Sequence, residues 1–453
     1  MPPGYEDPFE ISDCVVKTAQ LRNLEAECFA SFSDRISISI ERNDIKTSAI
    51  SSLKEIGARV ISKNRMGLAS QSVPALVTKN DLGKLVDSAI RLSQRSAPDP
   101  LNSFPDKGKS LRSTSLYDPS VARFSNEQAV LHAREMIRAA SRDKTVMIDS
   151  GAFNVERIVD CICNSNGLAM WEKRTVFSWY LSGWRREGDA ISNWDYEFDC
   201  AHFLKDVDTA STGERFASST SRVTLPIGFQ RFTGSLILAP NAILQLVVPP
   251  LSSAISSQSA QAGRSPWSQK VGEEVTCPDL SIIDDSKLRR GFGSKAFDRE
   301  GTPHRPLQIV REGRLLSFIY NCRTAAKEGK RSTGHAFGDA RSLPRVGITN
   351  LVLQANGRSL EELVKETRQG LFISNFSGFP DNITGDFSGT AKGAFLIQRG
   401  TIRGPVRGAI ISGNVFACLS NMLGASTDIQ QVFRCRTPHI TVKHALIQPA
   451  STF

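Results

Sequence analysis

The sequence lacks the continuous runs that mark membrane spans, secretion signals and nucleic-acid-binding tails. Its most apolar window, residues 235–254, is interrupted by Asn241, Gln245 and three prolines, which a bilayer-spanning helix would not tolerate. The opening stretch, MPPGYEDPFE, has early acidic residues and no apolar core, so we expect no signal peptide. These absences predict a cytoplasmic protein without a membrane partner.

Cysteine is present without the pattern of a disulfide framework. The nine cysteines are odd in number and scattered over a long chain, which favours reduced thiols in a cytoplasmic protein. Cys161 and Cys163 fall on one face of a predicted strand, but no second Cys or His pair has familiar zinc spacing. We therefore interpret both as small buried residues.

Charge is unbalanced but not concentrated. The formal net charge is +10, yet basic residues are interspersed with acids and no five like charges occur in a row. The aromatic residues do not alternate with Arg or Lys, as a platform for stacking single-stranded nucleic acid would require. We expect a generally basic protein, and nucleic acid is not the partner that this composition favours.

The sequence also lacks the common catalytic motifs. It contains no Gly-x-Ser-x-Gly and no P-loop, and the glycines at Gly291 imitate a dinucleotide fingerprint without its strand and helix. Of six histidines only His439 and His444 are close, and five residues apart on a strand their rings point to opposite faces. The residues alone therefore indicate no catalytic centre and no metal or other cofactor bound by this chain.

What is present is an α+β pattern. Ile36, Ile38 and Ile40 alternate with polar residues, which predicts a half-buried strand in an antiparallel meander. Apolar residues at helical spacing over 82–90 predict a helix on one face of that sheet. The character changes near Phe216, so we predict an N-terminal α+β domain over 1–215 and a strand-rich C-terminal domain with a cleft over 216–453.

Several local signals refine this picture. Asn166-Gly167 predicts a type I′ hairpin turn, and Glu312-Gly313 predicts a second hairpin. Ser359 with Glu362 predicts a capped helix that ends at Gly370. Residues 235–254 predict a buried strand, a turn and an apolar helix or loop, and the small polar residues that follow predict a flexible loop.

One histidine stands apart from the others. His335 lies in the glycine-rich stretch STGHAFGDA, before Asp339 and Arg341. It could be a metal ligand, a catalytic base or a hydrogen-bonded structural residue, and its isolation favours the structural role.

Taken in order, eight segments resemble the TldD/PmbA family, whose members are known as modulators of DNA gyrase and as peptidase subunits. They are EIGARVISKNRMGLASQ, SLYDPS, NSNGLAM, SLILAP, GSKAFDREGTP, RSTGHAFGDA, DNITGDFSGTAKGAFLIQRGTI and AIISGN, and they span nearly the whole chain. The resemblance implies a two-domain architecture of an N-terminal antiparallel sheet with helices and a strand-rich C-terminal domain.

The family pairs two related subunits, and the resemblance implies which one this chain is. The TldD type carries a His-Glu-x-x-x-His zinc motif after the strand that here reads SLILAP. The corresponding segment, 241–253, has no His, Glu or Cys and instead holds Val248, Pro249, Pro250 and Ser252. A catalytic helix running through the two prolines would lose backbone hydrogen bonds and clash with the preceding turn. The segment STGHA resembles the PmbA (TldE) type, which lacks the motif.

The resemblance therefore implies a metal-free subunit of a heterodimeric peptidase that processes leader or unfolded peptides, with zinc held by a TldD-like partner. Gly334, His335, Arg341 and Asp386 are then expected at the cleft or at the partner interface. Two alternatives stay open: a tailoring enzyme of natural-product biosynthesis acting on a peptide-like metabolite, and a DNA gyrase-modulating accessory protein.

Overall fold

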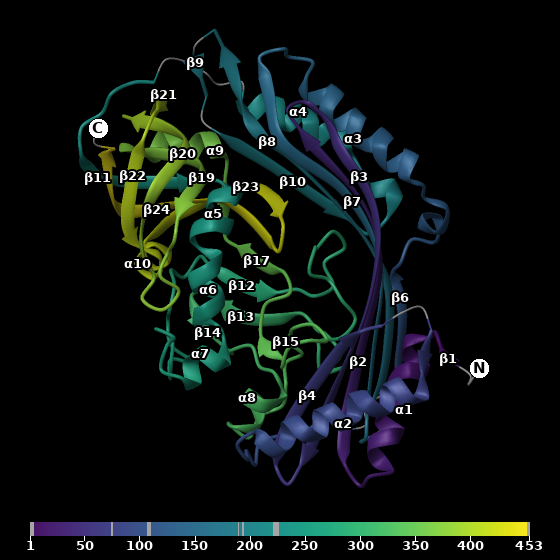
Figure 1. Ribbon diagram of the computed structural model, residues 1–453. Helices are drawn as coiled ribbons and strands as arrows, with labels where there is room; N and C mark the ends of the chain where they lie inside the picture. Colours follow the sequence, from purple (N-terminus) through teal and green to yellow (C-terminus); the bar gives the residue numbers. More distant parts are fainter. Residues whose placement is uncertain are drawn as a thin grey trace.

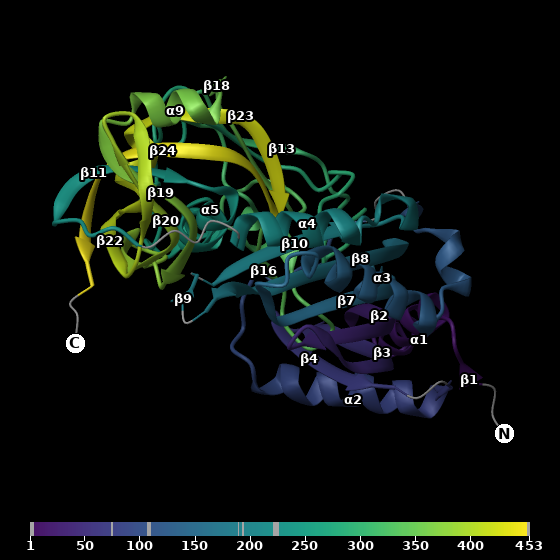
Figure 2. The same ribbon diagram turned by 90° about the horizontal axis from the view of Figure 1, so that it is seen from above.

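The computed structural model describes residues 4–73, 76–106, 110–188, 190–192, 194–220 and 226–450. Two sheets organise these residues, and the fold is the α+β architecture that the sequence predicts. Figure 1 shows a long, curved N-terminal sheet that arches around a C-terminal half on its inner side. Seen from above, the two halves lie side by side, with the C-terminus on the far side from the N-terminus (Figure 2).

Long strands and four helices build the N-terminal half. The helices are α1 (Pro8–Gln20), α2 (Lys79–Arg95), α3 (Asn126–Ala140) and α4 (Thr209–Thr220), with short 3-10 turns η1 (Pro119–Arg123) and η2 (Leu204–Asp206). The strands are β1 (Gly4–Tyr5), β2 (Glu25–Glu41), β3 (Asp44–Ser62), β4 (Arg65–Ser72), β5 (Val77–Thr78), β6 (Leu111–Leu116), β7 (Val146–Asn164), β8 (Ala169–Glu187), β9 (Ala190–Ile191) and β10 (Asp195–Ala201).

Shorter elements build the C-terminal half. Its helices are α5 (Pro240–Leu246), α6 (Val248–Ala254), α7 (Ser257–Gln261), α8 (Cys322–Ala326), α9 (Leu360–Glu366) and α10 (Val415–Ser420). Its strands are β11 (Phe232–Leu238), β12 (Ser281–Asp284), β13 (Leu307–Arg311), β14 (Arg314–Leu315), β15 (Ala336–Phe337), β16 (Arg345–Val346), β17 (Leu351–Gln354), β18 (Gly357–Arg358), β19 (Gln369–Gly378), β20 (Asp386–Gln398), β21 (Thr401–Val406), β22 (Ala409–Asn414), β23 (Met422–Val432) and β24 (Cys435–Pro449).

One face of the N-terminal sheet packs against helices and the other contacts the C-terminal half, because side chains alternate between the two faces along each strand. Its central order is β10-β8-β7-β2-β3-β4, with antiparallel neighbours. On β2, Ala26, Cys28 and Ala30 pack in the core beneath α1 and α2, and Ile36, Ile38 and Ile40 continue the same face beneath α3. The residues between them, including Glu27 and Phe29, face the C-terminal half.

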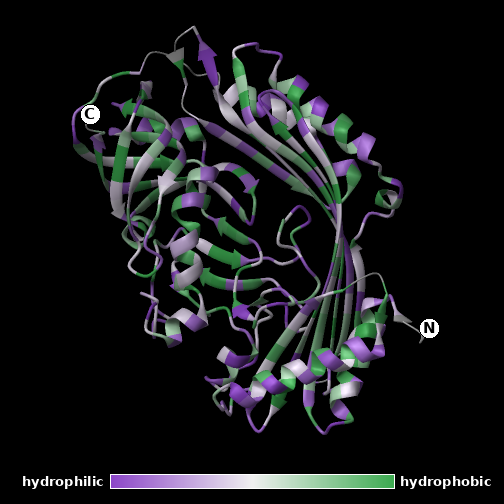
Figure 3. Cartoon of the chain, in the orientation of Figure 1, coloured by the Kyte–Doolittle hydropathy of each residue, from purple (hydrophilic) through white to green (hydrophobic). Residues whose placement is uncertain are grey.

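The C-terminal half has its own hydrophobic core. A mixed sheet runs β11-β19-β20-β22-β24-β17-β12-β13-β14, and β11 pairs parallel with β19 and antiparallel with β24. Figure 3 shows apolar residues concentrated along these strands, whereas polar residues are frequent on the outer helices of the N-terminal half. The last strand of the N-terminal sheet ends at Ala201, and the first strand of the C-terminal sheet begins at Phe232. Phe216 lies between them in α4, and its side chain packs in the N-terminal core. The domain limits 1–215 and 216–453 stay a prediction.

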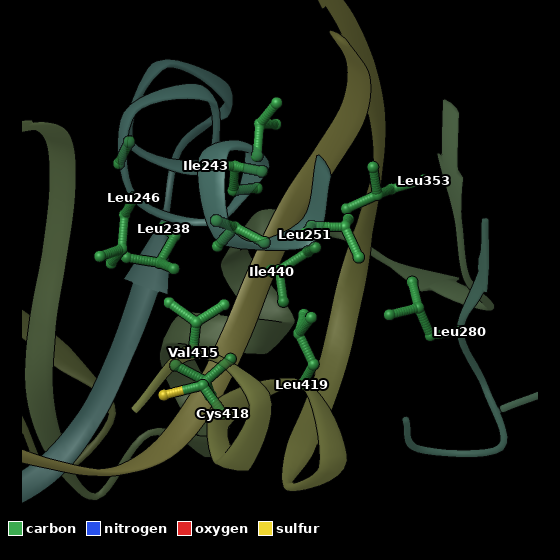
Figure 4. Packing of buried hydrophobic residues seen from close by; sticks show 14 of the residues in the cluster. Leu238, Ile243, Leu246, Leu251, Leu280, Leu353, Val415, Cys418, Leu419 and Ile440 are labelled. Atoms are coloured by element: carbon green, nitrogen blue, oxygen red, sulfur yellow. The ribbon is translucent and has the colours of Figure 1, made fainter. Parts of the chain in front are cut away.

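The segment after β11 forms two short helices, in agreement with the prediction of an apolar helix or loop. The chain forms α5 and then α6, and the backbone N–H of Leu251 still donates to the carbonyl of Val247 across their junction. Pro249 and Pro250 occupy the first turn of α6, where a proline removes no helical hydrogen bond. The predicted apolar helix is therefore present, but as two short helices and not as one helix running through the prolines. Side chains of both helices pack against β11, β24 and α10 (Figure 4).

Other local predictions are confirmed or corrected in their details. Ser359 and Glu362 form the predicted capping box, but the helix ends at Glu366 because β19 begins at Gln369. Glu312 and Gly313 both have positive φ, as the second hairpin requires. The turn at Asn166-Gly167 is present, yet only Gly167 has positive φ, so it is not type I′.

The region predicted as a flexible loop after residue 254 is ordered. Residues 257–261 form α7, and Trp267 is buried in the C-terminal core. Small polar side chains supply the local hydrogen bonds: the Ser265 hydroxyl donates to the Ala254 carbonyl at 2.6 Å. The prediction of a flexible loop was wrong because serine hydroxyls can also hydrogen-bond to backbone groups of an ordered, buried segment.

All nine cysteines are unpaired, and Cys161 and Cys163 are buried against the helices as predicted. No helix in the described residues combines the length and the apolar character that crossing a bilayer requires.

The position of the prolines in α6 makes a testable prediction about stability. Pro249→Ala and Pro250→Ala should each change the free energy of unfolding by less than about 1 kcal/mol, since neither proline disrupts a helical bond. Leu251→Ala, one residue on and fully buried, should cost about 2–5 kcal/mol. Urea unfolding of the three variants measures this. A loss or gain above about 2 kcal/mol for either proline variant would contradict the account of the junction.

Candidate functional site

The inner face of the N-terminal sheet carries buried charges that meet the C-terminal half. Glu27 on β2 accepts hydrogen bonds from Arg59 Nε at 2.8 Å and Nη2 at 2.5 Å. Arg299, from the segment between β12 and β13, donates from Nη1 to Glu27 Oε1 at 2.9 Å. Its guanidinium also lies over the ring of Phe29. All three charged side chains are almost fully buried. Each charge therefore depends on the others to compensate for the hydration that it loses on burial.

Gly57, on β3, shows how closely the two halves approach at this point. A methyl group added at Gly57 would lie 2.0 Å from the carbonyl oxygen of Ala340. A side chain there would therefore push the two halves apart, which accounts for a glycine in the middle of a strand.

A second charged cluster lies on β7 and β8. Arg174 Nη1 donates to Asp160 Oδ2 at 2.5 Å, and Lys295 Nζ lies 3.5 Å from the same oxygen. The backbone N–H of Ala296 donates to Glu172 Oε1 at 2.8 Å. Burial, and then the charge of Arg174, lowers the pKa of Lys295. The segment 295–299 is thus attached to the sheet by two separate charged groups.

His335 lies behind this segment and is buried. Its Nδ1 and the Thr333 hydroxyl are 2.8 Å apart, and its Nε2 lies 3.3 Å from Asp284 Oδ1. Burial alone would raise the pKa of Asp284, but the contacts with His335 and Thr349 bring it below its usual value. Gly334 reaches φ 78° beside the backbone of Pro303 and His304, a conformation that suits glycine.

Between these groups lies a small polar chamber with a volume of about 30 Å³, enough for about one or two water molecules. Its lining includes Asp298, His304 and His335. Burial, and then the charge of Glu300, raises the pKa of Asp298 to about 7. Burial, and then the neighbouring His335, lowers the pKa of His304 to about 3. At neutral pH His304 is therefore an uncharged imidazole.

The sequence-predicted site residues are only partly brought together. Gly334 and His335 lie at the chamber. Arg341 is half exposed, forms an ion pair with Glu55, and donates to the Ser72 hydroxyl at 3.0 Å, so it contacts the N-terminal sheet of its own chain. Asp386 is exposed at the start of β20, where it accepts from Asn414 Nδ2 at 2.9 Å. No described contact joins Asp386 to His335.

Segment 241–253, predicted to correspond to the zinc motif of TldD-type proteins, packs mostly into the protein interior. Val248 and Pro250 are buried, and the Ser252 hydroxyl donates to the Val248 carbonyl within its own helix at 2.7 Å. Pro249 is partly exposed. This stretch offers hydroxyl and amide groups but no imidazole, thiolate or carboxylate, the ligands that zinc prefers. The donor chemistry here does not fit zinc.

The residues that sequence reasoning missed are Lys295, Asp298, Arg299 and His304. They lie in or beside GSKAFDREGTP, a segment that carried the family resemblance without a role. A signal was available: the stretch holds four charged residues among small ones and has no helical or strand period. Such a stretch is typical of a loop held by its polar contacts.

Two family models match the chain. The PmbA/TldA metallopeptidase domain 1 matches residues 26–93, and the PmbA/TldA metallopeptidase C-terminal domain matches residues 233–448. The second match contains the segment that builds the chamber, and the first contains Glu27 and Arg59.

Two relatives match over most of their length, and a third matches over less than a third of its length. The chain is 24% identical to an uncharacterised protein of Methanocaldococcus jannaschii, over 96% of this chain and 99% of that protein. It is 26% identical to the metalloprotease PmbA of Escherichia coli O157:H7, over 89% of this chain and 88% of that protein. A TldD homolog of Haemophilus influenzae is 31% identical, but over only 32% of this chain and 30% of that protein.

Solved structures share the fold. TldE of Thermococcus kodakarensis superposes with a TM-score of 0.86 at 24% identity, covering 97% of this chain and 99% of that chain. A Thermotoga maritima protein described as a modulator of a DNA gyrase gives a TM-score of 0.87 at 22% identity, covering 97% and 99%.

The fold and the matched domain models define a two-domain α+β protein with a peptidase-like role. More particularly, the chain belongs to the TldD/PmbA family.

The raised pKa of Asp298 predicts a pH dependence of stability. An unfolded aspartate titrates near pH ~4, so the folded protein holds an extra proton between about pH 4 and 7. The stabilisation from this group is therefore complete below about pH 4 and is lost as the pH rises through about 7. Urea unfolding at pH 5 and pH 8 should show a smaller decrease for Asp298→Asn than for the unmodified protein.

Glu273→Gln, at an exposed carboxylate, is the matched control and should keep the full decrease. If Asp298→Asn and the unmodified protein lost the same free energy of unfolding between the two pH values, Asp298 would not titrate as described.

Proposed function

We propose that this chain is the metal-free, PmbA/TldE-type subunit of a two-subunit zinc peptidase that processes unfolded or leader peptides. Family membership gives a peptidase-like role in general. The proposal adds the heterodimer, the zinc-bearing TldD-like partner and the peptide substrate.

The observation that supports the proposal most strongly is the packing and composition of segment 241–253. Its side chains Ile243, Leu246 and Leu251 pack in the hydrophobic core. The segment contains no His, Cys, Asp or Glu that could bind zinc. Rebuilding a zinc site here would require carboxylate or imidazole groups in an apolar core, where unpaired polar groups are costly. Hydrolysis in the complex is therefore assigned to the partner.

The extent of the similarity to relatives supports the same division of labour. The match to the metalloprotease PmbA extends over 89% of this chain, whereas that to the TldD homolog of Haemophilus influenzae covers 32%. A chain that resembles both types, but only one of them over most of its length, fits the non-zinc member of a related pair.

No specific observation favours the two alternative functions. The tailoring activity stays a prediction. The description of the Thermotoga maritima protein as a gyrase modulator comes with 22% identity, which supports a shared fold alone. Cytoplasmic location likewise stays a prediction.

The test is co-expression of this chain with the TldD-like zinc subunit of the same organism. We expect a one-to-one complex by size-exclusion chromatography with light scattering, with one zinc per heterodimer. The complex should cleave an unstructured, fluorescently labelled peptide, and neither subunit should do so alone. Changing the glutamate of the partner's zinc motif to glutamine, with this chain intact, is the control that should abolish cleavage.

Two results would overturn the proposal. One is cleavage at the full rate by the zinc subunit without this chain. The other is stoichiometric zinc on the isolated chain.

A further inference from the structure

An open cleft lies where β6 and η2 of the N-terminal half face the segments 286–296 and 303–304 of the C-terminal half. Its volume is about 730 Å³, within the range of pockets that bind small molecules or a few peptide residues. Lys295 and His304 line both this cleft and the small polar chamber, so the two adjoin at these residues, which we call the inner end of the cleft. Figure 1 shows the C-terminal segments extending toward the curved sheet in this region.

The cleft has a positive lining. Four cationic residues contribute to it, namely Lys205, Lys287, Arg289 and Lys295, and the lining contains no Asp or Glu. Arg289 is paired with Asp206 at 3.0 Å. In the described part of the chain, no carboxylate lies within ion-pairing distance of Lys205 or Lys287. A cleft with surplus positive charge and a partly enclosed wall concentrates anions.

The inner end of the cleft has unused hydrogen-bonding groups. His304 is 5% exposed, and its Nδ1 has no hydrogen-bond partner among the described residues. Arg299 Nη2, which belongs to a residue lining the chamber, is also without one in that part of the chain. Buried polar atoms are nearly always paired, so two unpaired atoms around one chamber indicate a site for a polar guest.

The carboxylates around the chamber do not compete for this role. Asp160 is engaged by Arg174, by the Ser31 hydroxyl at 2.7 Å and by Lys295 Nζ at 3.5 Å, so a ligand at Lys295 shares the lysine with Asp160. Asp298 accepts backbone N–H groups of Glu300, Thr302 and Ala336, each at 2.9 Å. The oxygens of both carboxylates are thus bound within the protein. The Lys295 side chain, by contrast, is 34% exposed to solvent.

The remaining wall is apolar and hydroxylic. It includes Leu111, Leu116, Phe203, Ala296 and Pro303, together with three serines. A ligand that fits this wall carries an apolar portion beside its charge. One lysine and one neutral imidazole at the inner end suit a singly charged carboxylate better than a phosphate group with its higher charge.

We propose that this cleft binds a carboxylate ligand with an apolar portion, specifically the C-terminal end of a peptide, with the carboxylate at Lys295 and a neighbouring polar group of the ligand at His304. The choice of a peptide rests on the proposed function, whereas the carboxylate and its position follow from the cleft itself. Lys205 and Lys287 at the exposed rim attract the anion and orient its entry.

The test uses the isolated full-length chain and fluorescence anisotropy, so it needs neither zinc nor a partner. The probe is a labelled tetrapeptide with apolar residues and a free C-terminus. Its matched control is the same peptide with a C-terminal amide. We expect the free acid to bind at least about tenfold more tightly than the amide, and less tightly as salt rises.

The exposed pair Lys205→Gln/Lys287→Gln should weaken binding of the free acid about tenfold without changing the unfolding transition. His304→Ala should weaken both peptides. Lys144→Gln, an exposed lysine away from the cleft lining, should leave binding unchanged.

Equal affinity of the free acid and the amide, or full affinity in the double lysine variant, would overturn the inference. Displacement of the peptide by inorganic phosphate at concentrations where acetate has no effect would overturn the choice of carboxylate. Because the test measures binding to the isolated chain and not cleavage, it can still support or reject the carboxylate site if the heterodimer proposal fails.

Discussion

The arrangement of the two halves depends on one buried carboxylate, Glu27, that is shared by two guanidinium groups. Arg59 comes from the neighbouring strand and Arg299 from the C-terminal half. Glu300, the next residue, lies 3.8 Å from Arg59 and accepts the backbone N–H of Cys322 at 2.8 Å, so two acids balance two bases. Charges buried to this degree are tolerated only when each has its partners. The contact therefore specifies one relative position of the halves.

That position creates the candidate site. Segment 295–304 is held by Glu27 at Arg299 and by Glu172 at the backbone of Ala296, and the chamber and the cleft lie around it. The perturbed groups, Asp298 and His304, owe their pKa shifts mainly to burial at this contact. Segment 241–253 lies in the separate C-terminal core. The chain thus uses segment 241–253 for packing and has its buried charged groups at the contact between the halves.

The sequence predicted the parts that local periodicity controls. The meander at Ile36–Ile38–Ile40, the capping box at Ser359 and the hairpin at Glu312 follow from alternation and turn chemistry, which act over a few residues. The two-domain α+β fold followed from the same periodicity and from the change in composition near Phe216, and the resemblance implied it as well. The order in 257–261 was missed, because it depends on packing against distant parts of the chain. The candidate site was missed for the same reason: Glu27, Asp160 and Arg299 are far apart in sequence, and only the sheet register brings them together.

The central claim is that Glu27 and Arg299 act as one unit to join the halves. A double-mutant cycle of Glu27→Gln and Arg299→Met, followed by urea unfolding, measures it most directly. Each single change should cost about 3–5 kcal/mol because it leaves a buried charge without its partner. The double variant should cost less than the sum by at least about 1 kcal/mol. Costs that add within about 0.3 kcal/mol would contradict the claim.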